Sequence, residues 1–232
     1  MNNSGVHHEV QKFLAFFLLP IYTRYLDPGG YGIIALLGIL TMVISTITMC
    51  GLTNGISRYF YYTDKEGVNR DEVVWSAVTF IIIFTLIVVS ILFYFSEAIS
   101  QLLFDTPQYF YLVKLTLLNI FMSNIAGAGR SILIFEEKVW TVNAISLCGI
   151  VIGVISGLTM VVYFKRGVIG SVEAALISST FMTVFTSLLS IKKYSFNFNY
   201  GILKKQIRFS LPLMFAVFAF FFISWKKSSK RK

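Results

Sequence analysis

Long apolar runs alternate with short charged segments along the whole chain. A helix needs about 20 apolar residues to cross the hydrocarbon core of a bilayer. Read from charge to charge, five runs reach that length: Tyr31–Leu52, Val73–Phe95, Tyr109–Gly129, Val139–Phe164 and Val168–Ile191. We therefore predict a membrane-spanning helix over each of these five runs.

Two further apolar runs lie near the ends of the chain and are shorter. Phe13–Tyr22 contains Pro20, and Leu211–Trp225 is followed directly by a basic tail. Counting the first run as a span, we expect a cytoplasmic segment over residues 1–12 and a bundle of about six transmembrane helices over residues 13–208. Residues 209–232 are expected to be the start of a seventh hydrophobic segment with a truncated tail. Whether residues 13–22 and 211–225 span the membrane is left open by the sequence.

The composition supports the same fold class. Hydrophobic residues make up 56% of the chain and charged residues 13%, whereas soluble domains average about 45–50% and about 25%. A soluble domain must cover itself with polar surface, and this chain has too little polar surface to do so. With only 4 Pro and 2 Cys, collagen-like and disulfide-rich secreted proteins are also excluded. The sequence predicts an all-α integral membrane protein.

The formal net charge is +9. Most cations lie between the apolar runs rather than in a basic groove with interleaved aromatic residues, so nucleic acid is not an expected partner. If residues 13–22 cross the membrane, eleven Lys and Arg lie on the side of Met1, against three on the other side before the tail. The positive-inside rule then places the N-terminus in the cytoplasm. Membrane lipids are expected partners of these cations.

One face of the third run carries polar and small residues. At 100° per residue, five of them fall within an arc of about 80°: Thr116, Asn119, Ser123, Gly127 and Arg130. Asn and Arg are costly against lipid, so this stripe predicts the lining of a watery cavity. Similar stripes occur in the first and fifth of the five runs, and for these helix packing is favoured, with cavity lining as the alternative. Their residues are Gly38, Thr41, Ser45 and Thr48 in the first run, and Ser171, Ala175, Ser178, Ser179, Met182 and Thr186 in the fifth.

Two other features have packing or surface interpretations. Gly149, Gly153 and Gly157 form two small-xxx-small steps, which predict close approach of a neighbouring helix. Lys114 lies on roughly the opposite side of its helix from the Asn119–Arg130 stripe. We expect Lys114 to reach the outer headgroups with its long side chain, with cavity lining as the alternative.

The sequence lacks the patterns typical of catalytic, metal and cofactor sites. It has no Gly-rich loop followed by Lys-Ser/Thr, no nucleophile–base–orienter set and no His/Cys ligand spacing. We therefore predict that the protein is not an enzyme and has no catalytic residues, bound metal or cofactor. Cation-coupled carriers usually place a carboxylate deep in the membrane, and here Glu173, near a helix start, comes closest.

Several short motifs and their order carry a family resemblance. Residues 19–26 read Leu-Pro-Ile-Tyr-Thr-Arg-Tyr-Leu, residues 55–60 read Gly-Ile-Ser-Arg-Tyr-Phe, and residues 209–213 read Phe-Ser-Leu-Pro-Leu. Tyr31-Gly32-Ile33 and Gly167-Val168-Ile169-Gly170 fall between them. This order resembles the N-terminal half of polysaccharide-biosynthesis flippases of the Wzx type, within the multidrug, oligosaccharidyl-lipid and polysaccharide exporter superfamily.

The resemblance implies one half of a two-bundle carrier, whose substrate site lies between halves that rock about it. Its substrate would be an undecaprenyl-diphosphate-linked oligosaccharide, such as an O-antigen unit, flipped to the outer leaflet of the cytoplasmic membrane. Arg24 and Arg58 match basic positions near the cavity mouth, and arginine suits phosphate oxygens. With them, Arg130, Asn119 and Ser123 are the candidate residues for binding the diphosphate and the sugar.

Two alternatives to a flippase are kept. One is a cation-coupled multidrug exporter of the same superfamily, and the other is a non-functional truncated fragment. One bundle cannot form both walls of an alternating-access cavity, so a second half or a partner subunit is also expected.

Overall fold

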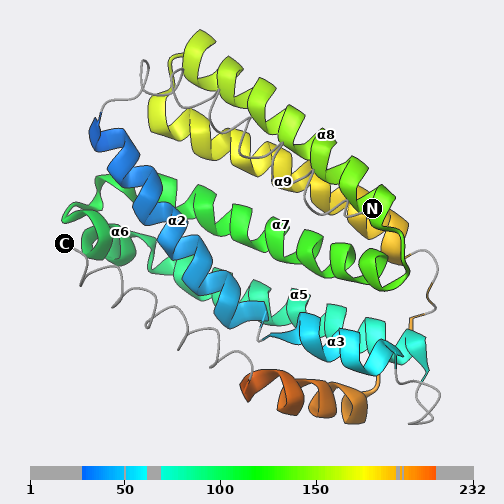
Figure 1. The fold of residues 1–232 in the computed structure, drawn as a ribbon. Helices are drawn as coiled ribbons and strands as arrows, with labels where there is room; N and C mark the ends of the chain where they lie inside the picture. Colours follow the sequence, from blue (N-terminus) through cyan, green and yellow to red (C-terminus); the bar gives the residue numbers. More distant parts are fainter. Residues whose placement is uncertain (1–27, 50, 62–68, 192–193, 195, 213–232) are drawn as a thin grey trace, which may run out of the picture.

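The structure, a computed structural model, is a set of long helices that lie side by side (Figure 1). It describes residues 28–49, 51–61, 69–191, 194 and 196–212. Every regular element among these residues is helical.

Five helices are long and apolar enough to cross a membrane. They are α2 (Pro28–Met49), α5 (Arg70–Tyr94), α7 (Phe110–Phe135) preceded by η1 (Pro107–Tyr109), α8 (Val139–Leu158) continued by the π-helical η2 (Thr159–Tyr163), and α9 (Gly167–Ile191). The shorter helices are α3 (Leu52–Tyr61), α6 (Ser96–Phe104) and a helix over residues 200–212. The all-α membrane fold and its five long spans are thus confirmed, whereas residues 13–22 lie outside the described residues.

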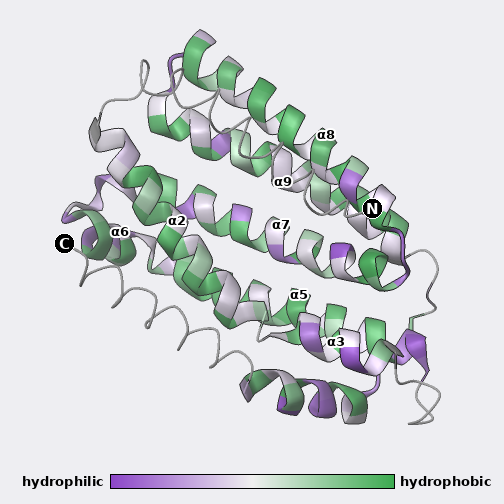
Figure 2. Cartoon of the chain, in the orientation of Figure 1, coloured by the Kyte–Doolittle hydropathy of each residue, from purple (hydrophilic) through white to green (hydrophobic). Residues whose placement is uncertain are grey.

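The helix α7 is central to the bundle. It packs against α2 and α5 on one side and against α8 and α9 on the other (Figure 1). Apolar residues dominate the long helices, but hydrophilic residues recur along α7 (Figure 2). Three of these polar residues, Thr116, Asn124 and Ser131, are buried.

Two predicted spans have different boundaries in the structure. The chain does not run straight from α2 into α3, because Gly51 breaks the helix with a φ of 65°, a conformation that glycine adopts at little cost. The helix α7 also continues past the predicted end at Gly129 to Phe135. Arg130 is exposed, so its charge does not require the helix to end there.

The start of α5 shows how local sequence sets a helix end. Asn69 caps the helix, and its side-chain oxygen accepts a hydrogen bond from the Asp71 backbone N–H at 3.1 Å. Asp71 and Glu72 follow in the first turn, where negative charge is favourable. The apolar run that follows then continues as a membrane-length helix.

A buried polar cluster joins α2, α5 and α7. The Asn124 amide nitrogen donates to Thr48 Oγ1 at 2.6 Å and to Thr85 Oγ1 at 3.4 Å. All three side chains are at most 2% exposed. Satisfied polar groups of this kind link membrane helices, and Thr48 from the predicted Ser/Thr stripe of the first run has this packing role.

The predicted glycine packing is present between α8 and α9. A Cβ at Gly149 would lie 2.7 Å from Met182 Cε, and one at Gly153 would lie 3.4 Å from Ser178 Cβ. Ser178 Oγ donates to the Gly149 carbonyl at 2.7 Å. The two helices approach closely because these positions lack side chains.

Candidate functional site

Three cavities follow one another along α7 and α9. We call them outer, middle and inner, the inner one being nearest the bundle end that is predicted to face the cytoplasm. On α7 the outer cavity is lined by Tyr111 and Leu112, the middle one by Thr116 and Asn119, and the inner one by Ser123, Ala126, Gly127 and Arg130. The 18 residue-to-residue steps from Leu112 to Arg130 span about 27 Å at 1.5 Å per residue, close to the thickness of a bilayer core of about 30 Å. The series therefore extends over most of a membrane crossing.

The outer cavity is the largest of the three, at about 830 Å³. Its wall includes Phe104 and Tyr109, whose rings meet edge to face at 5.2 Å, together with Tyr111, Gln108 and Asp105. Tyr111 lies on α7, and the others come from the segment of α6 and η1, which was not predicted from the sequence. Aromatic rings and amide or carboxylate groups together offer apolar faces and hydrogen-bonding groups to a polar ligand.

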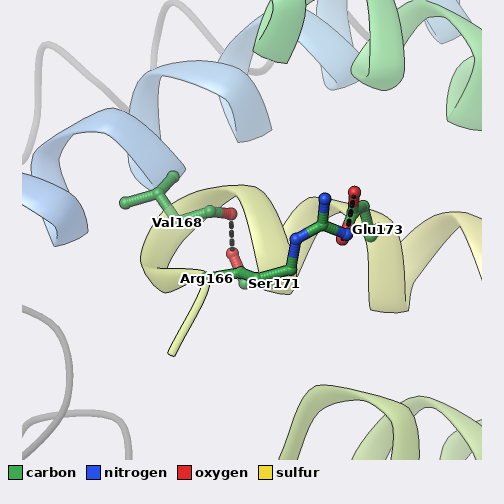
Figure 3. A network of polar contacts seen from close by, with 4 residues as sticks. All are labelled: Arg166, Val168, Ser171 and Glu173. Carbon is green, nitrogen blue, oxygen red and sulfur yellow. Dashed lines mark hydrogen bonds and ion pairs between the residues drawn. The ribbon is translucent and has the colours of Figure 1, made fainter. Parts of the chain in front are cut away.

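An ion pair lies beside the outer cavity (Figure 3). Arg166, which lines the cavity, donates through Nη1 to Glu173 Oε1 at 2.7 Å and Oε2 at 2.6 Å. Ser171 Oγ donates to the Val168 carbonyl at 2.7 Å in the same turn. The carboxylate closest to mid-span in the sequence is thus paired with an arginine near the helix start.

The middle cavity, of about 330 Å³, lies between α2, α7 and α9. Two of its lining residues carry buried oxygen atoms without a hydrogen-bond partner: Asn119 Oδ1 and the Tyr31 hydroxyl. By contrast, the Thr41 and Thr116 hydroxyls donate to carbonyls of their own helices at 2.9 and 2.8 Å. Unpartnered buried polar atoms are uncommon in proteins, so the two oxygens mark a place where a ligand or water can bind.

The inner cavity, of about 190 Å³, lies between α7, α8 and α9. Ser123 and Arg130 line it from α7, Ser146 from α8, and Ser179 and Thr186 from α9. Arg130 is the one charged residue among its described lining residues, and its side chain is exposed. A cation therefore marks the end of the series that is predicted to face the cytoplasm.

The profile of a family described as polysaccharide biosynthesis proteins matches residues 8–227 of this chain. The chain belongs to this family. No curated protein matches the sequence of this polysaccharide biosynthesis protein at a significant level.

Two solved structures share the fold of this polysaccharide biosynthesis protein. One is a MATE in the bent conformation, with a TM-score of 0.67 and 18% sequence identity over 84% of this chain. The other is a multidrug resistance MATE family transporter of the MOP superfamily in an outward-facing conformation, with a TM-score of 0.71 and 19% identity over 90% of this chain. The matched regions cover 46% and 49% of those chains, so this chain spans about half the length of either transporter.

The structure of this polysaccharide biosynthesis protein brings together part of the predicted site. Asn119 lines the middle cavity, and Ser123 and Arg130 line the inner one. Arg58 lines none of the three cavities: it is exposed on α3, with its guanidinium carbon 4.4 Å from the ring centroid of Phe209. Arg24 lies outside the described residues.

Other predictions about side chains have clear outcomes. The stripe of α9 has both of the roles considered for it. Ser171 and Ala175 line the middle cavity, and Ser179 and Thr186 line the inner one, whereas Ser178 packs against Gly149 and Gly153 of α8. Lys114 lines none of the three and lies 5.0 Å from the ring centroids of both Phe93 and Phe110.

Sequence reasoning missed Tyr31, Ser146, Tyr109 and Arg166 as cavity residues of this polysaccharide biosynthesis protein. Tyr31 was predicted to start a span and to belong to a family motif, but not to line a cavity, although it shares the helical spacing of Gly38 and Thr41, which line the same cavity. That shared face was the available signal. Nothing in the sequence spacing indicates that the α6–η1 segment closes over the helix ends.

Proposed function

We propose that this polysaccharide biosynthesis protein moves a lipid-linked oligosaccharide across the cytoplasmic membrane, with its described helices forming one wall of the path. The observation that carries the proposal is the series of three cavities along the polar face of α7. A polar headgroup crossing a bilayer needs such a face, because hydrocarbon offers it no hydrogen bonds.

The chemistry of the cavities fits the two parts of an undecaprenyl-diphosphate-linked oligosaccharide. Arg130 supplies a guanidinium in the inner cavity, and guanidinium groups bind phosphate oxygens with two parallel hydrogen bonds. Asn119 and Tyr31 offer unpartnered polar atoms for sugar hydroxyls in the middle cavity. The outer cavity adds aromatic rings and further polar groups.

Alternating access requires a second wall. The MATE structures with this fold are about twice as long as this chain, and we propose that a second bundle or a partner subunit provides the opposing wall. Arg24 and Arg58 remain proposed diphosphate contacts at the mouth of the assembled path.

The test is complementation of a bacterial strain that lacks its own flippase but makes the lipid-linked glycan. This chain is expressed alone and together with a second bundle of the same family, and surface glycan and membrane expression are both measured. Arg130→Gln is expected to lower export at least about tenfold, as for the loss of a charge-assisted contact, whereas Arg130→Lys keeps part of it.

Lys165→Gln is the matched control, because it removes one cation outside the three cavities. Equal export by wild type and Arg130→Gln at equal expression would remove the proposed phosphate contact. The transport proposal would be contradicted if the wild-type chain restored no surface glycan, either alone or with the second bundle, despite good expression in the membrane.

A multidrug exporter of the same fold is the competing function, and drug-resistance assays under a proton gradient separate it from a flippase. In the described part of the chain, Glu173 is the carboxylate closest to mid-span, and it is paired with Arg166. Drug resistance conferred without glycan export would favour the exporter.

A further inference from the structure

A short segment after α9 has two different sides. The Asn197 and Asn199 side-chain amides donate to Glu72 at 3.3 and 2.7 Å. Between and beside them, Phe196 and Phe198 are 70% and 44% exposed, and Tyr200 is 69% exposed. The alternation fixes the asparagines on the start of α5 and leaves three aromatic rings on the outside.

Backbone contacts hold this segment firmly on α5. Trp75 Nε1 donates to the Tyr194 carbonyl at 3.1 Å, and the Asn199 backbone N–H donates to Ser76 Oγ at 2.9 Å. The Phe196 ring meets the Trp75 ring edge to face at 4.9 Å. The outward position of the aromatic rings is therefore built into the fold at the end of the bundle where α5 begins.

The helix over residues 200–212 continues the same two-sided pattern. Asn199 Oδ1 caps its start by accepting from the Gly201 backbone N–H at 2.9 Å. Ile202, Leu203 and Gln206 are buried, and the Gln206 amide donates to the Val73 carbonyl at 3.0 Å. On the other side, Lys204, Lys205 and Arg208 are exposed.

The exposed side is strongly basic. Residues 194–212 contain these three cations and no Asp or Glu. Among the described residues, the carboxylates of Glu72 and Glu136 accept hydrogen bonds from the inward side of this segment. Three aromatic rings and three cations thus share one surface, which we call the aromatic-basic surface. It consists of Phe196, Phe198, Tyr200, Lys204, Lys205 and Arg208.

We propose that the aromatic-basic surface binds anionic phospholipid headgroups of the leaflet next to the start of α5. Aromatic side chains favour the interface between headgroups and hydrocarbon. Lysine and arginine stems lie along apolar surface while their charges reach lipid phosphates. Each cation near an anionic leaflet contributes about 1 kcal/mol of attraction. The cation count predicts that this end of the bundle faces the cytoplasm, where anionic lipids are commonly enriched.

The test measures which lipids stay bound to the full chain. The protein is reconstituted in equimolar phosphatidylcholine and phosphatidylglycerol vesicles and extracted gently, and the bound lipids are counted by native mass spectrometry. Wild type is expected to retain more phosphatidylglycerol than phosphatidylcholine. The double variant, Lys204→Gln with Arg208→Gln, is expected to lower the ratio of bound phosphatidylglycerol to bound phosphatidylcholine by roughly fivefold for each cation removed.

Two matched variants define the control. Lys204→Arg with Arg208→Lys keeps both charges and is expected to keep the ratio, and Lys165→Gln at the other end of the bundle leaves it unchanged. An unchanged ratio in the double Gln variant would overturn the proposal, as would an equal fall in Lys165→Gln.

A second readout does not depend on extraction. In a chain with Trp140→Phe and Trp225→Phe, the remaining Trp75 reports on its neighbour Phe196. Brominated phosphatidylglycerol is expected to quench its fluorescence more than brominated phosphatidylcholine, and the double Gln variant is expected to abolish the difference. Equal quenching by the two lipids in wild type would overturn the proposal.

Discussion

Asn119 and Asn124 lie on the same helix but have opposite surroundings. Asn124 is 2% exposed and donates to two threonine hydroxyls. Asn119 Oδ1 is buried in the wall of the middle cavity without a partner. We therefore propose that Asn124 stabilises the fold and that Asn119 Oδ1 is available to bind a ligand or water.

Asn119→Leu tests the binding role. We expect thermal stability in detergent to stay about equal, because Asn119 Oδ1 has no hydrogen-bond partner within the described part of the chain. We expect glycan export to fall, because the cavity wall loses its amide. The measurement is a melting curve beside the complementation assay, and a stable variant with full export would contradict the assignment.

Asn124→Ala tests the structural role on the same helix. We expect it to lower the free energy of unfolding by about 1–3 kcal/mol, because two helix-linking hydrogen bonds and some packing are lost. The same melting assay measures it. A melting temperature equal to that of wild type would show that the cluster is not stabilising.

At the residue scale, the sequence predicts which residues form the polar face of α7. It does not predict which residues from distant parts of the chain come into contact. Thr116, Asn119, Ser123 and Arg130 line cavities because helical spacing alone places them on one face. The place of Arg58 was not predictable in this way. It depends on Phe209, some 150 residues away in the chain, and spacing carries no information about such contacts.

Glycines decide how closely the helices approach. A Cβ at Gly129 of α7 would lie 3.1 Å from Thr186 Cβ and 3.2 Å from the Thr186 backbone carbon on α9, whereas at Gly38 it would meet nothing within 4 Å. Backbone atoms cannot move aside as a flexible side chain can.

Gly129→Ala is therefore expected to lower stability by about 1–3 kcal/mol, because it pushes α9 away from α7. Gly38→Ala is the control and is expected to be neutral or to stabilise by up to about 1 kcal/mol, since alanine is the better helix former. Melting curves of both variants in one detergent decide the point. Equal effects would contradict the close packing of α7 on α9.

The turn between α7 and α8 is held by a buried carboxylate. Glu136 accepts a hydrogen bond from the Tyr194 hydroxyl at 2.5 Å and pairs with Lys138 at 2.7 Å, and its side chain is 4% exposed. Burial first, and then the hydrogen bond and the nearby negative charge of Glu136, raise the pKa of Tyr194 well above its ordinary value of about 10.

Because folding favours the neutral phenol, this stabilisation is complete below about pH 10 and is lost as the pH rises toward the folded-state pKa. Tyr194→Phe is expected to lower stability at pH 7 by about 1–3 kcal/mol, because Glu136 loses a donor. The variant is also expected to lose less stability than wild type above pH 10. The free energy of unfolding of wild type and variant, measured from pH 7 to 11, checks both expectations. The same pH dependence in the two proteins would contradict the role of Tyr194.

At the element scale, hydrophobic length predicts the five spans because a bilayer demands long apolar helices. It does not predict α6 and η1, which are 9 and 3 residues long and are ordered by contacts such as Ser100 Oγ donating to the Thr106 carbonyl at 2.7 Å. The break at Gly51 was also missed, because the apolar pattern continues through it.

At the scale of the whole molecule, the polar faces of α7 and α9 form a wall. The outer, middle and inner cavities follow each other along both helices, with α2 beside the first two and α8 beside the third. This half-length MATE-like fold thus places its polar groups where a crossing headgroup would meet them. The proposed path along α7 and α9 requires these cavities to be open to water.

Cysteine labelling of α7 tests that claim most directly. In a background of Cys50→Ser and Cys148→Ser, single cysteines replace Asn119, Ser123 or Leu118, the last being 39% exposed and lining none of the three cavities. A membrane-impermeant maleimide is then applied to intact cells, which expose the outer face of the membrane, and to inverted vesicles, which expose the cytoplasmic face. The account predicts rapid labelling at positions 119 and 123 and little at 118. Equal rates at the three positions, or no labelling at 119 and 123 from either face, would contradict it.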